Sequence, residues 1–249
     1  MIKGITFDLW DTVFIDDSDE PKRKAAGRPS KSVERRQLVH KFINKYSPAS
    51  FELVNSVYDA VDAAFKKVWL DQHVTWNVQE RLKLVLKGLG KQLPESEINE
   101  LIRLHEEMEL DFRPDFVTGV HETLAELSKN FKLAVISDTI FSPGRTLRKL
   151  LEDESLLGFF DVFVFSDEQG FSKPDVRVFN AASDGLGIEL NELVHIGDRE
   201  HNDIIGPKKL GMGAVLCTAA IDRGSNNTQA DAIFKDYKDL PKIIETINK

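Results

Sequence analysis

The sequence has little of three features that would each define a class of protein. It contains a single cysteine, Cys217, so a disulfide-rich secreted scaffold is excluded. No apolar run approaches the roughly 20 residues that a helix needs to cross a bilayer. Positive charge is in deficit: the formal net charge is −8 at pH 7, whereas a nucleic-acid binder normally carries a basic surface. The first residues, with acidic Asp8 among them, do not match a signal peptide. We expect a cytoplasmic enzyme that binds neither nucleic acid nor a membrane.

Five short apolar runs predict the strands of a parallel sheet. They lie at residues 2–7, 132–136, 162–165, 193–196 and 214–217. The runs are continuously apolar rather than alternating, which is typical of strands that are buried on both faces. Segments with helical spacing of apolar residues separate the last four runs, at residues 146–151, 176–186 and 203–210. This alternation predicts a doubly wound, Rossmann-like α/β core.

The gap between the first two predicted strands is far longer than one crossover needs. Helical patterns fill most of it, at residues 33–46, 51–70, 78–89 and 95–110. They predict an α-helical cap domain inserted into the core. We therefore divide the chain into a core of residues 1–16 and 114–249 and a cap of residues 17–113. Aromatic residues of the insert, Trp69 among them, are expected in the packed interior between its helices.

A basic stretch opens the insert. Residues 21–36 hold seven lysines and arginines, together with Gly27 and Pro29. The composition favours a solvated, mobile entry loop. The alternative is a basic lip that attracts anionic substrates toward a site rich in carboxylates.

Polar side chains follow the predicted strands at their carboxyl ends, where ligands bind in open α/β sheets. In chain order they are Asp8, Trp10, Asp11, Thr12, Ser137, Asp138, Lys173, Asp198 and Asp203. Singly, each could be a turn or helix-capping residue. Together, three carboxylates, a hydroxyl and a lysine would converge on one edge of the sheet. Clustered carboxylates repel one another, so this site requires a cation, and oxygen ligands favour magnesium. The lysine would hold an anionic group.

Four segments of the predicted core carry a family resemblance. They are FDLWDT at 7–12, VIS at 135–137, KPD at 173–175, and HIGD at 195–198 with Asp203. In this order they resemble the four motifs of the haloacid dehalogenase superfamily, most members of which are phosphatases. The resemblance covers the whole core, and the insert lies where capped members of the superfamily carry theirs.

The resemblance implies roles for individual residues. Asp8 would attack phosphorus and form an aspartyl-phosphate. Thr12, Ser137 and Asp138 would belong to the phosphate-binding site, and Lys173 would stabilise the charge that develops there. Magnesium would be ligated by Asp8, by the backbone carbonyl of Trp10 and by Asp198, with Asp203 in contact directly or through water. The implied substrate is a small phosphorylated molecule over which the cap closes, and the implied assembly is a monomer or homodimer.

The resemblance fails at Trp10. Phosphatases of the superfamily carry an aspartate there as general acid and base, a role that an indole cannot perform. Three functions follow. The favoured one is a phosphatase in which Asp11 or a cap residue transfers the proton, or whose substrates have leaving groups that need little protonation. Asp11 equally suits a turn. The second is a dehalogenase-type enzyme, but such members work without magnesium, so the pair Asp198 and Asp203 counts against it. The third is a binding or regulatory scaffold of low activity.

Overall fold

The core is a parallel sheet whose central strand leads to Asp8. In residues 1–248, which the computed structural model describes, six strands lie in the order β3-β2-β1-β4-β5-β6. They are β1 (Gly4–Phe7), β2 (Lys132–Ser137), β3 (Val162–Phe165), β4 (Leu193–Gly197), β5 (Gly213–Cys217) and β6 (Ala232–Phe234). Phe7 pairs with Val135 on one side and with Ile196 on the other. Strand order reverses at β1, so the crevice where such sheets bind ligands lies at its carboxyl end.

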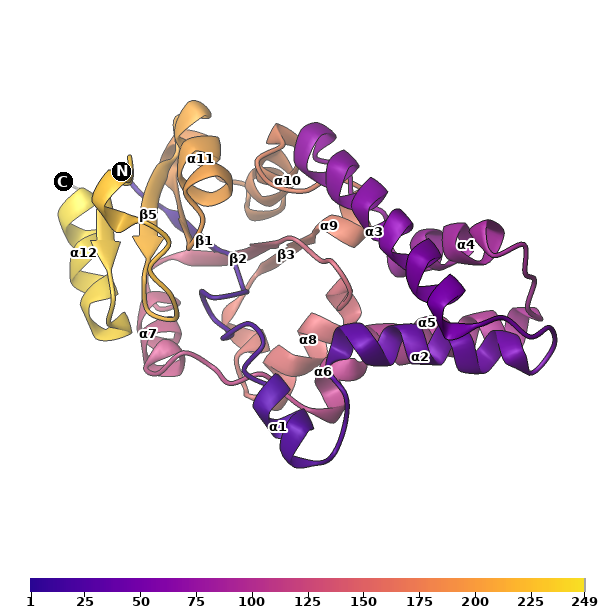
Figure 1. Cartoon of the computed structure of the whole chain (residues 1–249). Helices are drawn as coiled ribbons and strands as arrows, with labels where there is room; N and C mark the ends of the chain where they lie inside the picture. Colours follow the sequence, from indigo (N-terminus) through magenta and orange to yellow (C-terminus); the bar gives the residue numbers. More distant parts are fainter. Residues whose placement is uncertain (249) are drawn as a thin grey trace.

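Helices cover both faces of this sheet (Figure 1). One face packs against α7 (Val120–Leu127), α8 (Gly144–Asp153) and α12 (Leu240–Ile247). The other face packs against α10 (Val176–Leu186), and α11 (Gly206–Lys209) contacts strand β5. The predicted doubly wound fold is confirmed. Strand β6, helix α12 and the short helix α9 (Ser166–Gln169) were not predicted. Residues 203–210 are not one helix, because a π-helical turn (Glu200–Ile205) precedes α11.

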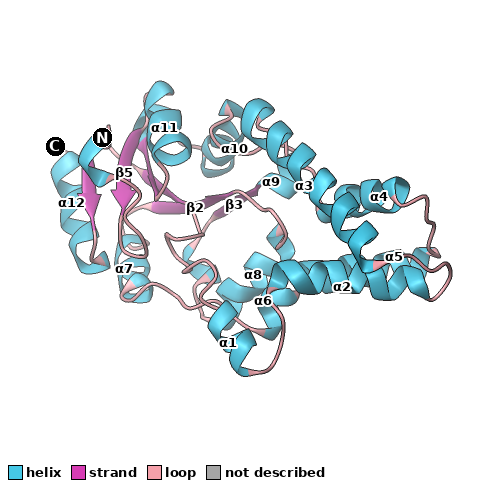
Figure 2. Cartoon of the chain, viewed as in Figure 1, coloured by secondary structure: helices cyan, strands magenta, loops and turns pink. Residues whose placement is uncertain are grey.

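The insert is a helical layer that projects from one end of the core (Figure 2). Its helices are α2 (Lys31–Asn44), α3 (Phe51–Gln72), α4 (Val78–Gly88) and α5 (Glu95–Glu106), followed by the short α6 (Met108–Asp111). Side-chain oxygens of Ser30, Ser50 and Asn77 cap the first three of these helices. The insert has its own apolar core, with Val39, Val54 and Leu101 fully buried in it. Division of the chain at residues 16 and 114 stays a prediction.

The basic stretch is not a loop, so that prediction is wrong. It folds as α1 (Glu20–Ala25) and the first turns of α2. Arg23, Lys31 and Arg35 are buried rather than solvated. Carboxylates on neighbouring turns compensate their charges: Arg23 pairs with Glu34, and Lys31 Nζ lies 2.7 Å from Asp19 Oδ1. Composition alone could not reveal these partners, and without them burial of a cation is unfavourable.

Both termini lie on the side of the core that faces away from the insert (Figure 1). The backbone amide of Ile2, which precedes β1, donates to Asn248 Oδ1 at the end of α12 at 2.5 Å. Within residues 1–248, no helix combines the length and the apolar character that crossing a membrane requires.

Candidate active site

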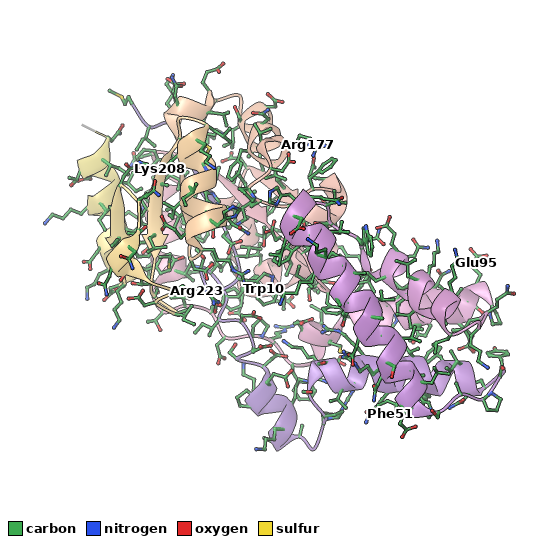
Figure 3. All side chains as sticks on the ribbon, turned by 45° about the horizontal axis from the view of Figure 1, so that its top comes forward. Trp10, Phe51, Glu95, Arg177, Lys208 and Arg223 are labelled. Atoms are coloured by element: carbon green, nitrogen blue, oxygen red, sulfur yellow. The ribbon has the colours of Figure 1, made fainter. Side chains whose placement is uncertain are left out.

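A cavity of about 330 Å³ opens where the carboxyl ends of the strands meet the insert. Asp8, Asp138, Lys173 and Asp203 form its wall on the sheet side, and Trp10 lies where the core meets the insert (Figure 3). These residues come from separate segments of the chain, and the parallel sheet places all of them at one edge. The cavity has the size of a small-molecule site.

Lys173 connects two of the predicted site carboxylates. Its Nζ lies 2.7 Å from Asp8 Oδ1 and 2.7 Å from Asp203 Oδ1, and the side chain is buried. Burial opposes the charge on Lys173, but Asp203 and Asp8 together raise its pKa above the usual range. Burial also raises the pKa of Asp8, and Lys173 opposes this shift. The lysine therefore stays cationic and holds one oxygen of Asp8.

A chain of buried hydrogen bonds fixes Asp203. Its Oδ1 lies 3.1 Å from His195 Nε2, and its Oδ2 accepts the backbone N–H of Arg199 at 2.9 Å. His195 Nδ1 in turn lies 2.7 Å from the hydroxyl of Thr6. Burial alone would raise the pKa of Asp203, but Lys173 and His195 lower it well below its usual range. Gly197 makes room for this arrangement, because a Cβ there would lie 2.4 Å from Asp203 Cγ.

Sequence reasoning missed the part that His195 plays. Thr6 and His195 are register partners on β1 and β4. Both are fully buried polar residues within otherwise apolar strands, which was the available signal. Their contact required the strand order, which the sequence did not specify.

The carboxylates fit a divalent cation. Asp8, Asp198 and Asp203 each bring one oxygen within 4.8 Å of the other two. Arg223 Nε donates to Asp198 Oδ2 at 2.5 Å, whereas Asp198 Oδ1 is buried and has no hydrogen-bond partner in the described chain. Burial, reinforced by Asp8 and Asp203, raises the pKa of Asp198 to about 7. An orphaned oxygen beside two other carboxylates is the donor set that magnesium prefers.

The predicted phosphate-binding residues occupy different positions relative to the cavity. Asp138 lines it, where its Oδ1 accepts the backbone N–H of Lys173 at 2.9 Å and its Oδ2 accepts from Asn202 at 3.2 Å. Burial raises the pKa of Asp138 to about 7. Ser137 and Thr12 are buried, their hydroxyls have no partner among residues 1–248, and neither belongs to the cavity wall described here.

The structure does not bring Asp11 to the cavity wall. Asp11 adopts a left-handed backbone conformation with φ of 54°. Its Oδ1 accepts the backbone N–H of Asp16 at 3.0 Å, and its Oδ2 accepts from Arg223 Nη2 at 2.5 Å. This is the turn-forming alternative. Arg223 was missed because it lies in a loop after β5, and no local pattern marks it as the joint partner of Asp11 and Asp198.

The insert forms the opposite wall of the cavity. Lys31, Arg35, Trp69 and Glu109 line it. Trp69 therefore does not belong to the packed interior between the helices, where it was expected. The spacing of apolar residues places Trp69 on one face of α3, but it does not show whether that face contacts another helix or a cavity.

Comparison with known proteins adds independent evidence. The sequence model of a family described as haloacid dehalogenase-like hydrolase matches residues 41–217. The glyceraldehyde 3-phosphate phosphatase of Methanocaldococcus jannaschii is 29% identical over 264 aligned residues that cover 100% of both chains. The match to the family model begins after Asp8, so what is inferred for Asp8 rests on the geometry above.

Solved structures show the same fold. The 2-haloacid dehalogenase of Pseudomonas syringae pv. tomato aligns with a TM-score of 0.71 and 21% identity, over 99% of this chain and 100% of that one. The hydrolase YfnB of Bacillus subtilis, in a structure bound to magnesium, aligns with a TM-score of 0.59 and 19% identity over 98% of each chain. At these identities the likeness concerns the fold alone.

Proposed function

The chain belongs to the haloacid dehalogenase-like hydrolase family, and from this premise we propose that it is a magnesium-dependent phosphatase of small molecules with Asp8 as its nucleophile. Family membership confirms the resemblance seen in the sequence. One observation carries the proposal: buried Lys173 holds Asp8 and Asp203 at 2.7 Å each, beside an orphaned oxygen of Asp198. Such a site suits transfer of a phosphoryl group from the substrate to the Asp8 carboxylate and then to water.

The proposed reaction has two steps. The oxygen of Asp8 that Lys173 does not hold attacks phosphorus, a new P–O bond forms, and the bond to the leaving oxygen breaks. Water then attacks the aspartyl-phosphate, which releases phosphate and regenerates Asp8. Lys173 stabilises negative charge in both steps because it is already oriented and buried. We assign phosphoryl binding to the hydroxyl of Ser137, which is free of other partners in the described residues.

The metal would be held by Asp8, by Asp198 Oδ1 and by the backbone carbonyl of Trp10. Asp203 is better suited to contact through water, because its oxygens already accept hydrogen bonds from Lys173, His195 and Arg199. Bound magnesium would offset the mutual repulsion of the carboxylates and the phosphate. Asp203 then serves chiefly to position Lys173.

Position 10 supplies no carboxylate that could protonate the leaving group. Asp11 does not replace it, because Arg223 and the Asp16 amide hold its carboxylate. We therefore infer that the enzyme works best on phosphates whose leaving groups need little protonation, such as acyl phosphates. A relative is named a glyceraldehyde 3-phosphate phosphatase, which supports phosphate transfer but does not define this chain's substrate.

A dehalogenase is the second candidate. Trp10 at the position of the second aspartate favours it, and a structural neighbour bears that name. The cation-binding arrangement of Asp8, Asp198 and Asp203 speaks for the phosphatase. A cytoplasmic location and a monomeric or dimeric state stay predictions.

One experiment separates the candidates. We expect the purified enzyme to release phosphate from small phosphorylated molecules with magnesium, and to lose this activity with EDTA or with Asp8→Asn. Magnesium-independent release of halide from 2-haloacids would overturn the phosphatase in favour of the dehalogenase. Full phosphatase activity in Asp8→Asn would remove Asp8 from its assigned role. Metal binding without either activity would support the scaffold.

A further inference from the structure

Three ionised side chains are buried together in the cavity wall that the insert provides. Lys31, Arg35 and Glu109 are each no more than 5% exposed, and all three line the cavity. Two cations thus line the cavity with Glu109 between them, and the carboxylates of Asp16 and Asp17 line it as well. Because burial makes an uncompensated charge unfavourable, the partners of each cation decide what the cavity can accept.

Lys31 has enough partners within the protein. Its Nζ lies 2.7 Å from Asp19 Oδ1, 3.2 Å from Asp17 Oδ1 and 3.4 Å from Glu109 Oε1. The other oxygen of Glu109 accepts the hydroxyl of Ser142 at 2.5 Å. Glu109 is therefore shared between Lys31, Ser142 and Arg35.

Arg35 is not compensated to the same degree. Its closest ionic contact is Nη2 to Glu109 Oε1 at 3.5 Å, and its Nε has no hydrogen-bond partner within residues 1–248. The guanidinium lies 3.6 Å from the centre of the Phe141 ring, and the guanidinium of Arg81 lies 4.0 Å from the same ring. Burial lowers the pKa of Arg35; Glu109 opposes this shift, and the charge of Arg81 adds to it.

Arg81 differs from Arg35 although both contact Phe141. Arg81 Nη2 donates to Asp62 Oδ1 and its Nη1 donates to the carbonyl of Ile140, each at 2.7 Å. It does not line this cavity in the described structure. Arg35 is thus the buried cation of the cavity wall whose nearest carboxylate is 3.5 Å away, whereas Arg199, which also lines the cavity 4.0 Å from Asp198 Oδ1, is partly exposed to solvent.

A second donor stands on the same wall. Trp69 lines the cavity, and its Nε1 is buried without a partner among the described residues. Leaving such a donor unpaired costs about 1–3 kcal/mol, which a bound acceptor would recover. Two residues that line the insert side of the cavity therefore each carry an N–H donor without a partner in the described residues, and the sheet side presents the proposed phosphate site.

We propose that Arg35 anchors a second oxyanion, a carboxylate or a second phosphate, on the leaving group of the substrate, with Trp69 Nε1 donating to an oxygen of the same part. The inference rests on the proposed phosphatase function and narrows its substrates to small phosphorylated molecules, acyl phosphates among them, that carry another negative charge. Guanidinium suits both anions because its N–H groups form a planar fork.

Matched substrates test this subsite. Glycerol 3-phosphate and 3-phosphoglycerate have the same length and differ in a hydroxymethyl or a carboxylate at the far end. 1,3-Propanediol monophosphate and bisphosphate make the same comparison for a phosphate. In at least one pair, we expect kcat/KM to be at least tenfold higher for the doubly anionic compound than for its singly anionic partner. The pair that shows this difference identifies the anion. No preference in either pair would overturn the proposal.

Variants assign the preference to Arg35. We expect Arg35→Gln to reduce the ratio of kcat/KM within the preferred pair by roughly ten- to hundredfold, chiefly through KM, and Arg35→Lys to restore part of it. Arg36→Gln is the control: Arg36 is the next residue of α2, pairs with Asp59 and lies outside the cavity wall. An unchanged ratio in Arg35→Gln, or an equal loss in Arg36→Gln, would contradict the assignment.

Equilibrium binding separates this inference from the proposed reaction. Asp8→Asn, which should not turn over, is titrated with each compound while tryptophan fluorescence is followed. Tighter binding of a doubly anionic compound, lost on adding Arg35→Gln, would support the subsite even if no phosphate were released by the native enzyme. Equal binding within both pairs, with phosphate release intact, would leave the phosphatase standing and overturn the subsite. Thermal melting of each variant checks that it is folded.

Discussion

Trp10 is the residue at which this site departs from a complete phosphatase. It lines the cavity, and its ring packs edge-on against Phe14 at 5.4 Å between centroids. An indole N–H donates a hydrogen bond but does not exchange protons with a leaving group. With Asp11 held by Arg223, neither position 10 nor position 11 supplies a carboxylate to the cavity wall. Proton transfer should therefore limit turnover of esters with poor leaving groups.

Trp10→Asp should restore this step. We expect kcat for an alkyl phosphate to rise about a hundredfold, within the range that general acid–base catalysis provides. The rise should be much smaller for p-nitrophenyl phosphate, whose leaving group needs no proton. Trp10→Phe, which also removes the indole without adding an acid, is the control. A similar gain in both variants would mean that relief of bulk, not proton transfer, was responsible.

Gly197 controls the position of Asp203 by its lack of a side chain. In Gly197→Ala the new methyl group would lie 2.4 Å from Asp203 Cγ, so the carboxylate must move away from Lys173. We expect kcat to fall at least tenfold and the free energy of unfolding to fall by about 1–3 kcal/mol. Gly213→Ala is the matched control, because a Cβ there meets a Val194 methyl group at a milder 3.2 Å. If Gly197→Ala and Gly213→Ala reduced phosphate release and stability to urea equally, this account would be contradicted.

Helix α5 shows how an element can depend on a neutral histidine. His105 is fully buried near its end, with Nδ1 2.8 Å from the Leu101 carbonyl and its ring stacked on Tyr58. Burial, reinforced by the charge of Arg35, lowers the pKa of His105 to about 3. The unfolded chain, in contrast, binds a proton at this residue near pH 6.5. The helical insert therefore favours the neutral ring.

Stability should consequently fall in acid. The contribution is complete above pH 6.5 and is lost as the pH falls from 6.5 toward 3, because only the unfolded chain takes up the proton. Relative to His105→Gln, the native protein should lose about 1.4 kcal/mol of unfolding free energy per pH unit in this window. Urea unfolding of both proteins at several pH values measures the difference, which cancels other titrating groups. Exposed His121, changed to Gln, is the control, and a slope that His105→Gln leaves unaltered would argue against this assignment.

The elements also show why the basic stretch was predicted wrongly. Lysines, arginines, a glycine and a proline in one segment are typical of a loop, yet residues 31–36 begin helix α2 after the Ser30 cap. The Ser30 N-cap is a local signal in the sequence for the start of this helix. The burial of Arg35 and Lys31 is different, because it depends on Glu109, more than seventy residues later in the chain.

At the scale of the whole molecule, insert and core are joined beside the proposed catalytic lysine. The backbone N–H of Thr75 donates to the Gly170 carbonyl at 3.0 Å, and that of Ser172 donates to the His73 carbonyl at 2.8 Å. The second bond lies one residue before Lys173. The insert can therefore influence the loop that carries this lysine, which links the substrate-facing wall to the site of reaction.

Thr75→Pro tests this connection, because proline lacks the N–H that reaches Gly170. We expect faster hydrogen exchange at the Ser172 amide. We also expect kcat/KM to fall several-fold, because about one hydrogen bond that supports the Lys173 loop is lost. Thr75→Ala keeps the backbone donor and should behave like the native protein. Unchanged exchange and activity in Thr75→Pro would show that this junction does not support the site.

The sequence by itself determined five of the six described strands, their alternation with helices and the end of the sheet that carries the chemistry. Apolar periodicity is local, and the residues after successive parallel strands must meet at one edge, so Asp8, Lys173, Asp198 and Asp203 could be grouped in advance. Only the tertiary structure decided which partners they have. Tertiary contacts place Lys173 between two carboxylates and His195 beside Asp203. They also pair Arg223 with both Asp11 and Asp198 and leave Arg35 poorly compensated. Such contacts set burial and charge compensation, and these quantities have no local pattern in the chain.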